Sequence, residues 1–555
     1  MVGCAGIGRP HTKNLLTAAS AHSPFLSLTV PLMFALLRAL LHRVGPLKRV
    51  RTFLDDPVDT QRHLLRSMLN HAAATEWGQR YGFADIARQR DVVAAYQDRV
   101  PLHSYDDIAD DAMRVRNGAE DVLWPGRATH FAVSSGTVSD GKVLPISQAT
   151  IDANRGFSVG VGLHYLLDTH KWQYLLGRHL TLPGSVSEDP DHPGTYAGEV
   201  SGILAKHAPG FFKALYQAVP NEIAFLPSWE EKLRTIAERT VDQDIRLIVM
   251  VPSWAKKLFE HVIAAHNRRY DAHATTVHEV WPNLQLYISG GVALSSYRDQ
   301  LEDIVGGPID FIETYGASEG FFAFQNARDD DALLLHLNNG VFYEFVPMNE
   351  YGSAHPTRHT IATVETDVRY ALYVTSYSGL WSYDVGDVVQ FTQRHPFKIE
   401  VAGRTSEMID TFGEAIFADE VRDALYKACD ATGASFHHYH VAPAPAHDDA
   451  PPQHEWIIEF EDMPGDLDAF RDAVDTYLDR VNRHYHIRRE SDVMRAPQIT
   501  AVPEGTFYAW LQITKDRISG QTKVPRMSTE RTVAEGILSA QPSRSAAVSS
   551  PDPLR

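Results

Sequence analysis

Three apolar runs of strand length constrain the fold of this chain more than any other feature. The first, DIRLIVMVP (244–252), is continuous and rich in β-branched residues, and the segment WAKKLFEHVIAAHNRR that follows it has helical spacing. The other two, LQLYISGG (284–291) and IDFIETYG (309–316), both end at glycine. Buried strands that alternate with helices predict an α/β fold, in which ligands bind at the carboxyl ends of the strands.

The segments around this α/β part have other patterns. Residues 59–98 have helical spacing, whereas from residue 341 onward VFYEFV, ALYVTS and DVVQFTQ alternate as strands do. Further on, single helices alternate with strands in an α+β pattern. We therefore expect a large N-terminal domain with mixed sheets and a β-rich subdomain (1–404), a smaller α+β C-terminal domain (405–536) and a disordered tail (537–555).

The N-terminus contains an uncharged stretch of 15 residues, 23–37. It is short for a transmembrane helix, contains two prolines and is not followed by a signal cleavage site, so we expect no integral membrane span. The favoured interpretation is an amphipathic helix near residues 30–44 that packs on the main domain, and contact with a membrane surface is the alternative. Residues 1–32 are expected either to be disordered or to precede the true start, Met33.

Charge and cysteine content exclude several classes of function. Lys and Arg number 52 against 70 Asp and Glu, so the net charge is 52 − 70 = −18, and the chain has no Lys/Arg block. An acidic surface repels phosphate backbones, so we expect no nucleic-acid partner. Cys4 and Cys429 are the only cysteines, which excludes a disulfide framework and fits a cytoplasmic location. Nothing marks a dimer surface, and we expect a monomer.

The stretch HFAVSSGTVSDGKVLPIS (130–147) has most of the pattern of a Walker phosphate loop. A Walker loop needs Ser or Thr after Lys142 and a helix behind it, but Val143 and the segment VLPIS favour an extended return strand. We therefore expect a strand–loop–strand unit that binds an anion, with an unliganded hairpin turn as the alternative. Its candidate donors are the hydroxyls of Ser134, Ser135 and Thr137, the backbone at Gly136 and Gly141, and the ammonium of Lys142.

Later segments add groups that suit a bound nucleotide. TYGASEG offers Tyr315 for stacking on a base and Glu319 for Mg²⁺. YDVGDVVQF places Asp387 at the start of a strand, where a carboxylate can bind a ribose diol, and AGRTSE places Arg404 in a turn. SGQTKVPRM offers Lys523 in a loop flanked by Gly and Pro. Each signal is weak alone, but their occurrence in one chain favours a nucleotide site.

This order of segments resembles the adenylate-forming superfamily. It resembles more closely the Gretchen Hagen three (auxin-responsive promoter) family of acyl acid amido synthetases, as a bacterial-type member. The matching segments include VPLHSYDDIADDAMRVRNG (100–118), SSGTVSDGKVLP, PSWAKKLFE, YGASEG, YDVGD, LDRVNRHYHIRRES and PEGTFYAWLQ…GQTKVPR, and they extend over nearly the whole chain.

The resemblance implies an ATP- and Mg²⁺-dependent ligase. Such an enzyme adenylates a small carboxylic acid and transfers the acyl group to an amine, here expected to be an amino acid, to form an amide. The resemblance also implies a mobile C-terminal domain with a hinge near Arg404, where Thr405 and Ser406 replace the charged residue common in the superfamily.

The resemblance also assigns residues to a single site. In it, Tyr315 would pack on adenine, Asp387 would bind the ribose, and Lys523 would reach the α-phosphate. The implied ATP- and AMP-binding set comprises Ser134, Ser135, Gly136, Thr137, Tyr315, Gly316, Ala317, Ser318, Asp387 and Arg404. The implied catalytic set comprises Lys142, Glu319 and Lys523, with Glu319 as the metal ligand.

Three other functions stay open at this level. A thioester-forming ligase of the same superfamily would use coenzyme A as the acceptor. GASEG (316–320) also fits the G-x-S-x-G pattern of serine hydrolases with Ser318 as nucleophile, although FFAFQNA behind it is no clear amphipathic helix. The third is a nucleotide-binding protein without turnover.

Two sets of residues have weaker signals. Tyr165, Trp254 and Tyr287 are candidates for the acyl pocket by position alone, and each also fits core packing. The histidines of FHHYHVAP lack a zinc-binding spacing, so we interpret His437, His438 and His440 as ordinary strand residues.

Overall fold

The computed structural model describes most of the chain between residues 54 and 540. The described residues are 54–133, 142–226, 228–292, 294–405, 407–409, 411, 412, 414, 416–445, 451–514 and 524–540, with only the backbone given at 296. The helix expected near residues 30–44 and the tail from 541 lie outside them. Within the described ranges, no helix is both long and apolar enough to cross a membrane.

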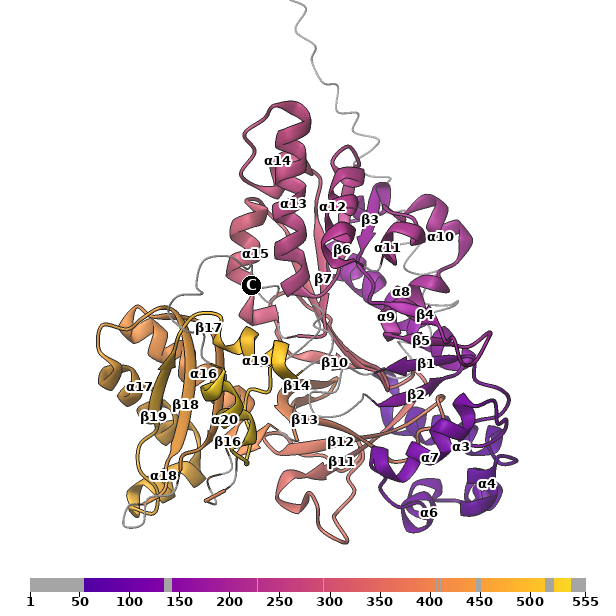
Figure 1. Cartoon of the computed structure of the whole chain (residues 1–555). Coiled ribbons are helices and arrows are strands. Elements are labelled where there is room, and N and C mark those ends of the chain that lie inside the picture. Colours follow the sequence, from indigo (N-terminus) through magenta and orange to yellow (C-terminus); the bar gives the residue numbers. More distant parts are fainter. Residues whose placement is uncertain are drawn as a thin grey trace, which may run out of the picture. The chain divides into compact units, whose positions relative to one another are not determined.

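In this part of the chain a ten-stranded mixed sheet has the order β11-β12-β13-β14-β10-β9-β8-β7-β6-β3 (Figure 1). Its parallel half comprises β3 (Arg178–Thr181), β6 (Ile245–Val249), β7 (Leu286–Gly290) and β8 (Asp310–Ala317). Its antiparallel half comprises β9 (Gly320–Gln325), β10 (Leu333–Leu335), β11 (Val341–Pro347), β12 (Arg369–Ser376), β13 (Tyr383–Arg394) and β14 (Phe397–Arg404). The predicted apolar strands are β6, β7 and β8, so the α/β prediction is confirmed.

Helices cover both faces of the parallel half. Leu247 and Leu286 pack with residues of α8 on one face, whereas Ile248 and Tyr287 pack with α12 and α13 on the other. Consecutive strand residues point to opposite faces, so strands buried on both sides have continuous apolar sequences. The helices are α8 (Gln148–Thr169) on the first face, and α12 (Trp229–Thr240), α13 (Pro252–Tyr270), α14 (Val277–Val280) and α15 (Arg298–Val305) on the second.

A smaller sheet with the order β2-β1-β5-β4 contains the predicted strand–loop–strand unit. β1 (His130–Val133) pairs antiparallel with β2 (Val143–Ile146), and Val133 lies opposite Val143. The prediction that a strand and not a helix follows Lys142 is therefore confirmed. β4 (Val186–Glu188) and β5 (Tyr196–Gly198) complete the sheet, and α9 (Val200–Lys206), α10 (Gly210–Leu215) and α11 (Asn221–Ala224) follow it.

The helices before β1 form the segment predicted to be helical. They are α3 (Pro57–His71), α4 (Glu76–Tyr81), α5 (Phe83–Arg88), α6 (Val92–Arg99) and α7 (Tyr105–Arg116). The buried side chain of Gln61 joins α3 to the large sheet. Its Nε2 donates to the carbonyl oxygens of Leu337 and Val341 at 2.8 and 2.9 Å, and its Oε1 accepts from the backbone N–H of Tyr343 at 3.0 Å.

We expect the substitution Gln61→Met to lower the free energy of unfolding by about 2 kcal/mol, because it leaves buried backbone groups of the sheet without partners. Urea unfolding measures the change. The control is Gln79→Met, at an exposed position on α4, which should change stability by less than about 0.5 kcal/mol. An equal loss in both variants would contradict this role for Gln61.

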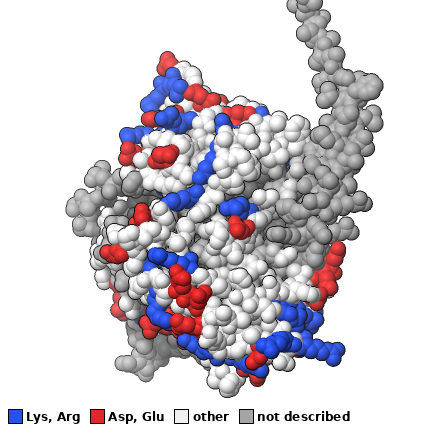
Figure 2. Space-filling model, turned by 90° about the vertical axis from the view of Figure 1, so that its right-hand side faces the viewer, with Lys and Arg blue, Asp and Glu red and all other residues white. Residues whose placement is uncertain are grey.

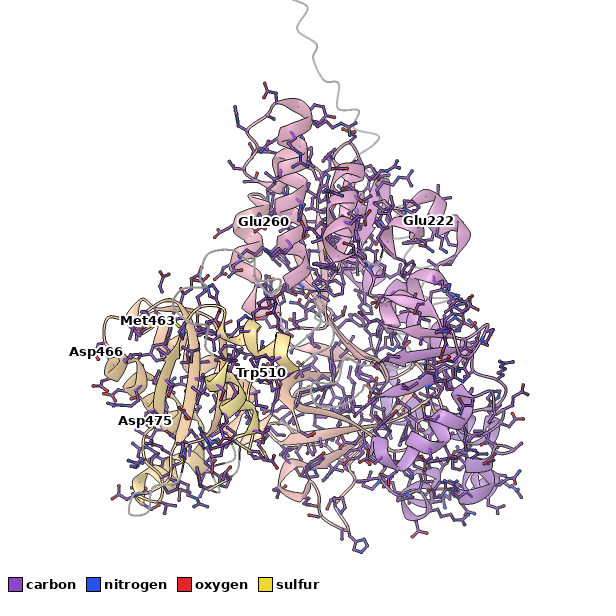
Figure 3. All side chains as sticks on the ribbon, viewed as in Figure 1. Glu222, Glu260, Met463, Asp466, Asp475 and Trp510 are labelled. Carbon is purple, nitrogen blue, oxygen red and sulfur yellow. The ribbon has the colours of Figure 1, made fainter. Side chains whose placement is uncertain are left out.

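A second α+β unit follows β14 and is built on the sheet β17-β18-β19. Trp456 and Ile458 pack with α16 and α17 on one face of this sheet, and Ile457 packs with Trp510 on the other. Figure 3 shows this arrangement, with Asp475 on the α17 side and Trp510 on the opposite side. This unit lies in the part of the chain where the sequence predicts an α+β pattern.

The elements of this unit are β15 (Met408–Ile409), β16 (Ile416–Phe417), α16 (Ala418–Thr432), β17 (Ser435–Pro443), β18 (His454–Asp462), α17 (Leu467–Val481), α18 (Arg483–Glu490), β19 (Gln498–Val502), α19 (Thr506–Thr514) and α20 (Thr532–Ser539). α20 extends beyond residue 536, the expected end of the domain. Hydrophobic packing stabilises this extension of α20, because Ile537 is fully buried in the cluster around Trp510.

Candidate active site

A cavity of about 2500 Å³ lies at the carboxyl ends of β6, β7 and β8. Its wall includes Met250 after β6, Gly290 at the end of β7, and the residues from Tyr315 to Glu319 at the end of β8. It continues along the start of β13 and the end of β14. This is the edge at which open α/β sheets bind their ligands, as the sequence led us to expect.

Asp387 accepts hydrogen bonds from two other predicted site residues. The hydroxyl of Tyr315 donates to its Oδ2 at 2.7 Å, and Nε of Arg404 donates to its Oδ1 at 3.0 Å. The pairing of β13 with β14 places Asp387 directly opposite Arg404. Each carboxylate oxygen can accept more than one hydrogen bond, so Asp387 can also accept hydrogen bonds from the two hydroxyls of a diol.

A bend in β13 orients Asp387. Gly386 has φ of +82°, a conformation that favours glycine, and its N–H donates to Oδ1 of Asp384 at 2.7 Å. Its carbonyl accepts from the N–H of Thr405 at 2.9 Å, which joins the bend to the end of β14. Asp384 also lines the cavity, and burial raises the pKa of its carboxyl above the ordinary range. No sequence signal distinguished Asp384, although the segment YDVGD contains it.

Glu319 lies in the two-residue turn between β8 and β9, because Ala317 pairs with Gly320 across this hairpin. Its side chain lines the cavity although the residue is only 6% exposed. Burial raises the pKa of Glu319 from the ordinary value of 4.5 to about 7, against the opposing charge of Lys142. A buried carboxylate that binds its proton this tightly is suited to a cationic ligand.

Lys142 lies at the start of β2, beside two tyrosine rings. Its Nζ is 5.6 Å from the ring centroid of Tyr383 and 5.9 Å from that of Tyr105. The hydroxyl of Tyr105 accepts a hydrogen bond from the N–H of Val143 at 2.9 Å, which fixes the base of the loop. Tyr105 was not among the predicted site residues, but it belongs to the segment VPLHSYDDI that carried the resemblance.

The structure brings together the predicted site residues that it describes. Lys142, Tyr315, Gly316, Ala317, Ser318, Glu319, Asp387 and Arg404 all line the one cavity. Ser134, Ser135, Gly136, Thr137 and Lys523 lie outside the described residues, so their roles stay predictions.

The residues around Glu319 fit a magnesium ion shared with a substrate. In the ranges that the structure describes, no group of three or more His, Cys, Asp or Glu residues is arranged to hold a metal. Mg²⁺ commonly binds through one or two carboxylates together with substrate phosphates and water. A single buried carboxylate beside Lys142 is consistent with that mode.

Part of the cavity wall is aromatic. It includes His179 of β3, Phe211 and Phe212 of α10 and Tyr216 just after α10, with His179 stacked on Tyr216 at 4.7 Å between ring centroids. Phe211 is 69% exposed although it lines the cavity. Figure 2 shows the molecule from this side, where Lys, Arg, Asp and Glu lie in small mixed groups between uncharged areas.

The three guessed acyl-pocket residues divide between core and cavity. Tyr165 and Tyr287 are buried in the core, where their hydroxyls donate to Asp310 at 2.7 Å and to the carbonyl of Met250 at 2.9 Å. Trp254 does line the cavity. No sequence signal identified the aromatic wall around His179, because those residues also have the pattern of an ordinary core.

The serine-hydrolase interpretation is wrong for this fold. Ser318 lies in the β8–β9 hairpin, whereas a nucleophile elbow joins a strand to a helix.

His440 has a structural contact, since its Nδ1 lies 2.7 Å from the carbonyl oxygen of Pro525.

Models of three domains of one family match the chain. The GH3 family N-terminal domain matches residues 46–168 and 152–309, the GH3 family central domain matches residues 334–404, and the GH3 family C-terminal domain matches residues 419–532. Lys142, Asp387 and Arg404 lie within these matched ranges. The site residues from Tyr315 to Glu319 lie between residues 309 and 334, outside the N-terminal and central matches.

Curated plant proteins are similar to the chain. The indole-3-acetic acid-amido synthetase GH3.2 of Arabidopsis thaliana is 22% identical over 416 residues, which are 63% of this chain and 74% of that protein. The indole-3-acetic acid-amido synthetase GH3.8 of Oryza sativa subsp. indica is 26% identical over 414 residues, 63% of this chain and 67% of that protein. Because these relatives are plant proteins, they do not support the expectation of a bacterial-type member.

Solved structures share the fold. The GH3.15 acyl acid amido synthetase has a TM-score of 0.69 at 17% identity, covering 88% of this chain and 94% of that one. A 2-hydroxyisobutyryl-CoA ligase in a postadenylation state has a TM-score of 0.54 at 13% identity, covering 86% and 91%.

Proposed function

The chain belongs to the GH3 family, and we propose on this premise that it is an AMP-forming carbon–nitrogen ligase. It adenylates a small carboxylic acid with ATP and transfers the acyl group to an amine, expected to be an amino acid. The observation that carries the proposal is the convergence of Lys142, Glu319, Asp387 and Arg404, from separate segments, on one cavity that also has an aromatic wall.

In the first step, the carboxylate of the acid attacks the α-phosphorus of ATP and pyrophosphate leaves. The step brings several negative charges together, so catalysis consists mainly of alignment and charge neutralisation. We propose that Lys142 neutralises a phosphate, that Asp387 binds the ribose diol and that the ring of Tyr315 packs on adenine. Glu319 would hold Mg²⁺, which when bound supplies charge neutralisation at the phosphates.

In the second step, the amine attacks the activated acyl carbon and AMP leaves. Water has to be excluded, because it would hydrolyse the activated acid. We propose that the C-terminal domain (405–536) moves about a hinge near Arg404 relative to the domain 1–404, and brings Lys523 to the α-phosphate in the first step. We further propose that the enzyme is a cytoplasmic monomer.

A screen for pyrophosphate release tests this function. The purified protein is incubated with Mg·ATP and single carboxylic acids, and the acid that releases pyrophosphate fastest is then incubated with pooled amino acids or with coenzyme A. Mass spectrometry should detect an amide. Absence of pyrophosphate release with every acid would refute adenylation, and a thioester in place of the amide would favour the coenzyme A ligase that the fold also resembles.

Activity should depend on pH through Glu319. Below pH 7 its carboxyl binds a proton and cannot bind Mg²⁺, so at limiting Mg²⁺ pyrophosphate release should fall roughly tenfold per pH unit below about 7. Saturating Mg²⁺ competes with the proton and should move this acid limb to lower pH. Profiles recorded at both Mg²⁺ concentrations measure the shift, and superimposable profiles would contradict the role of Glu319.

A further inference from the structure

The C-terminal unit contributes the guanidinium of Arg526 to the cavity wall. Arg526 lines the cavity, and its backbone carbonyl accepts from the N–H of Val441 at 2.9 Å, which fixes it beside β17. Its side chain lies over the ring of Tyr439, with Cζ 5.8 Å from the centroid. Among the described residues, no carboxylate lies within ion-pair distance of Arg526. The guanidinium therefore has its hydrogen-bonding capacity available to a ligand.

Tyr439 adds a second group that lacks a partner. The residue is 6% exposed and lines the same cavity, and its hydroxyl has no hydrogen-bond partner among the residues that the structure describes. A buried hydroxyl without a partner is unfavourable by about 1–3 kcal/mol, so such groups commonly bind a ligand or water. Because Arg526 lies over the ring of Tyr439, the two groups occupy the same part of the cavity wall. An anion bound there could accept hydrogen bonds from both the guanidinium and the hydroxyl.

The surrounding charges favour a singly charged anion. Arg422, also beside Tyr439, is paired with Asp423 at 2.8 Å, so its charge is already balanced. The other titratable groups that face Arg526 are Glu407, Tyr297 and Tyr426. The carboxylate of Glu407 would repel a phosphate dianion more strongly than a carboxylate, and a planar guanidinium matches the shape of a carboxylate.

We propose that Arg526 and the hydroxyl of Tyr439 bind the α-carboxylate of the acceptor amino acid. The inference rests on the proposed amide-forming function. Arg526 lines the same cavity as Glu319 and Asp387, so the acceptor would be held in the cavity in which the acid is activated. A new C–N bond forms there, the C–O bond to AMP breaks with its electron pair leaving on AMP, and the amine proton is released to solvent.

The test compares glycine with glycinamide as acceptors, using the acid that releases pyrophosphate fastest in the screen. The pair differs only at the carboxylate, and glycine lacks a side chain that would add its own specificity. Wild-type enzyme should prefer glycine in kcat/KM. Arg526→Gln should reduce this preference about 10- to 100-fold, the size expected for loss of a charge-assisted hydrogen bond, and R526K should restore part of it.

Arg480→Gln is the matched control. Arg480 lies over the ring of Tyr477 at 5.3 Å on α17, so it has the same arginine–tyrosine arrangement, but it does not line the cavity. This variant should keep the preference of the wild type. Tyr439→Phe should weaken the preference without lowering the melting temperature, because it removes a hydroxyl that has no hydrogen-bond partner within the described part of the chain.

The outcomes separate the two proposals. If the wild type releases no pyrophosphate with any acid, the proposed function fails. If it forms amides while R526Q and Y439F retain the full preference for glycine over glycinamide, only the assignment of the carboxylate site is overturned. A rise in the KM for ATP in R526Q, with the glycine preference unchanged, would assign the residue to phosphate and would also overturn it.

Discussion

Glu319→Gln should lower ATP-dependent pyrophosphate release about 1000-fold or more, because the amide cannot replace a carboxylate as ligand of a hard divalent cation where phosphate charge has to be neutralised. In the same variant the free energy of unfolding should rise. Raising the pKa of a carboxyl from 4.5 to about 7 corresponds to about 3 kcal/mol between its two protonation states. At pH 8 the substitution removes this cost, so thermal unfolding should occur at higher temperature.

The same variant should alter the dependence of stability on pH. Between pH 4.5 and about 7, the folded wild type retains a proton on Glu319 that the unfolded chain has lost. The folded state therefore binds more protons in this window, and the contribution of Glu319 to stability decreases as pH rises through it. Glu319→Gln lacks this contribution, and urea unfolding at several pH values measures the difference.

Glu344→Gln is the control for Glu319→Gln. It removes another buried carboxylate, which lies on β11 of the large sheet and has a structural role. Glu344 is fully buried, and Arg358 pairs with it at 2.8 Å. The substitution leaves the guanidinium without its partner and should destabilise the protein by about 3 kcal/mol, whereas the Mg²⁺ dependence of the folded enzyme should be unchanged. If Glu319→Gln were equally destabilising and retained activity, Glu319 would be a structural residue.

Asp387→Asn should raise the KM for ATP about 100-fold, the size expected for loss of hydrogen bonds to a charged acceptor. The amide also presents a donor group toward the donors of Tyr315 and Arg404, which now give their hydrogen bonds to the carboxylate at 2.7 and 3.0 Å. The specific measurement compares ATP with 2′,3′-dideoxy-ATP. Wild-type enzyme should prefer ATP, and the variant should lose that preference.

Tyr315→Phe is the control for Asp387. It keeps the ring that would pack on adenine but removes the hydroxyl that donates to Asp387. We expect less than about a tenfold change in the KM for ATP, because Arg404 still orients the carboxylate. If Asp387→Asn weakened ATP and its dideoxy analogue equally, Asp387 would support the site without binding the ribose.

The class of fold and most of the described site were predictable because they depend on local chemistry. The apolar runs of β6, β7 and β8 form strands buried on both faces, and that alone makes their sequences continuous and not alternating. Val143 and Pro145 predicted the strand β2 in place of a Walker helix. Glu319, Asp387 and Arg404 were noticeable because each polar group stands beside a glycine or in a short segment next to an apolar strand. The structure corrects two details, because Asp387 lies within β13 and not at its start, and Arg404 is the last residue of β14 and not part of a turn.

Contacts between distant segments were decided only by the tertiary structure. Tyr105 stabilises the base of the loop at Val143, and Asp384 orients Gly386, although neither has a local pattern that distinguishes it from a surface residue. Tyr165, Tyr287 and Trp254 are all buried, but only Trp254 also lines the cavity. Likewise no sequence pattern distinguishes Arg526 from the other arginines. Its position beside Tyr439 results from its backbone contact with β17. Side-chain chemistry and strand period are local properties, whereas burial, desolvation and the absence of a partner arise only when segments far apart in the sequence pack together.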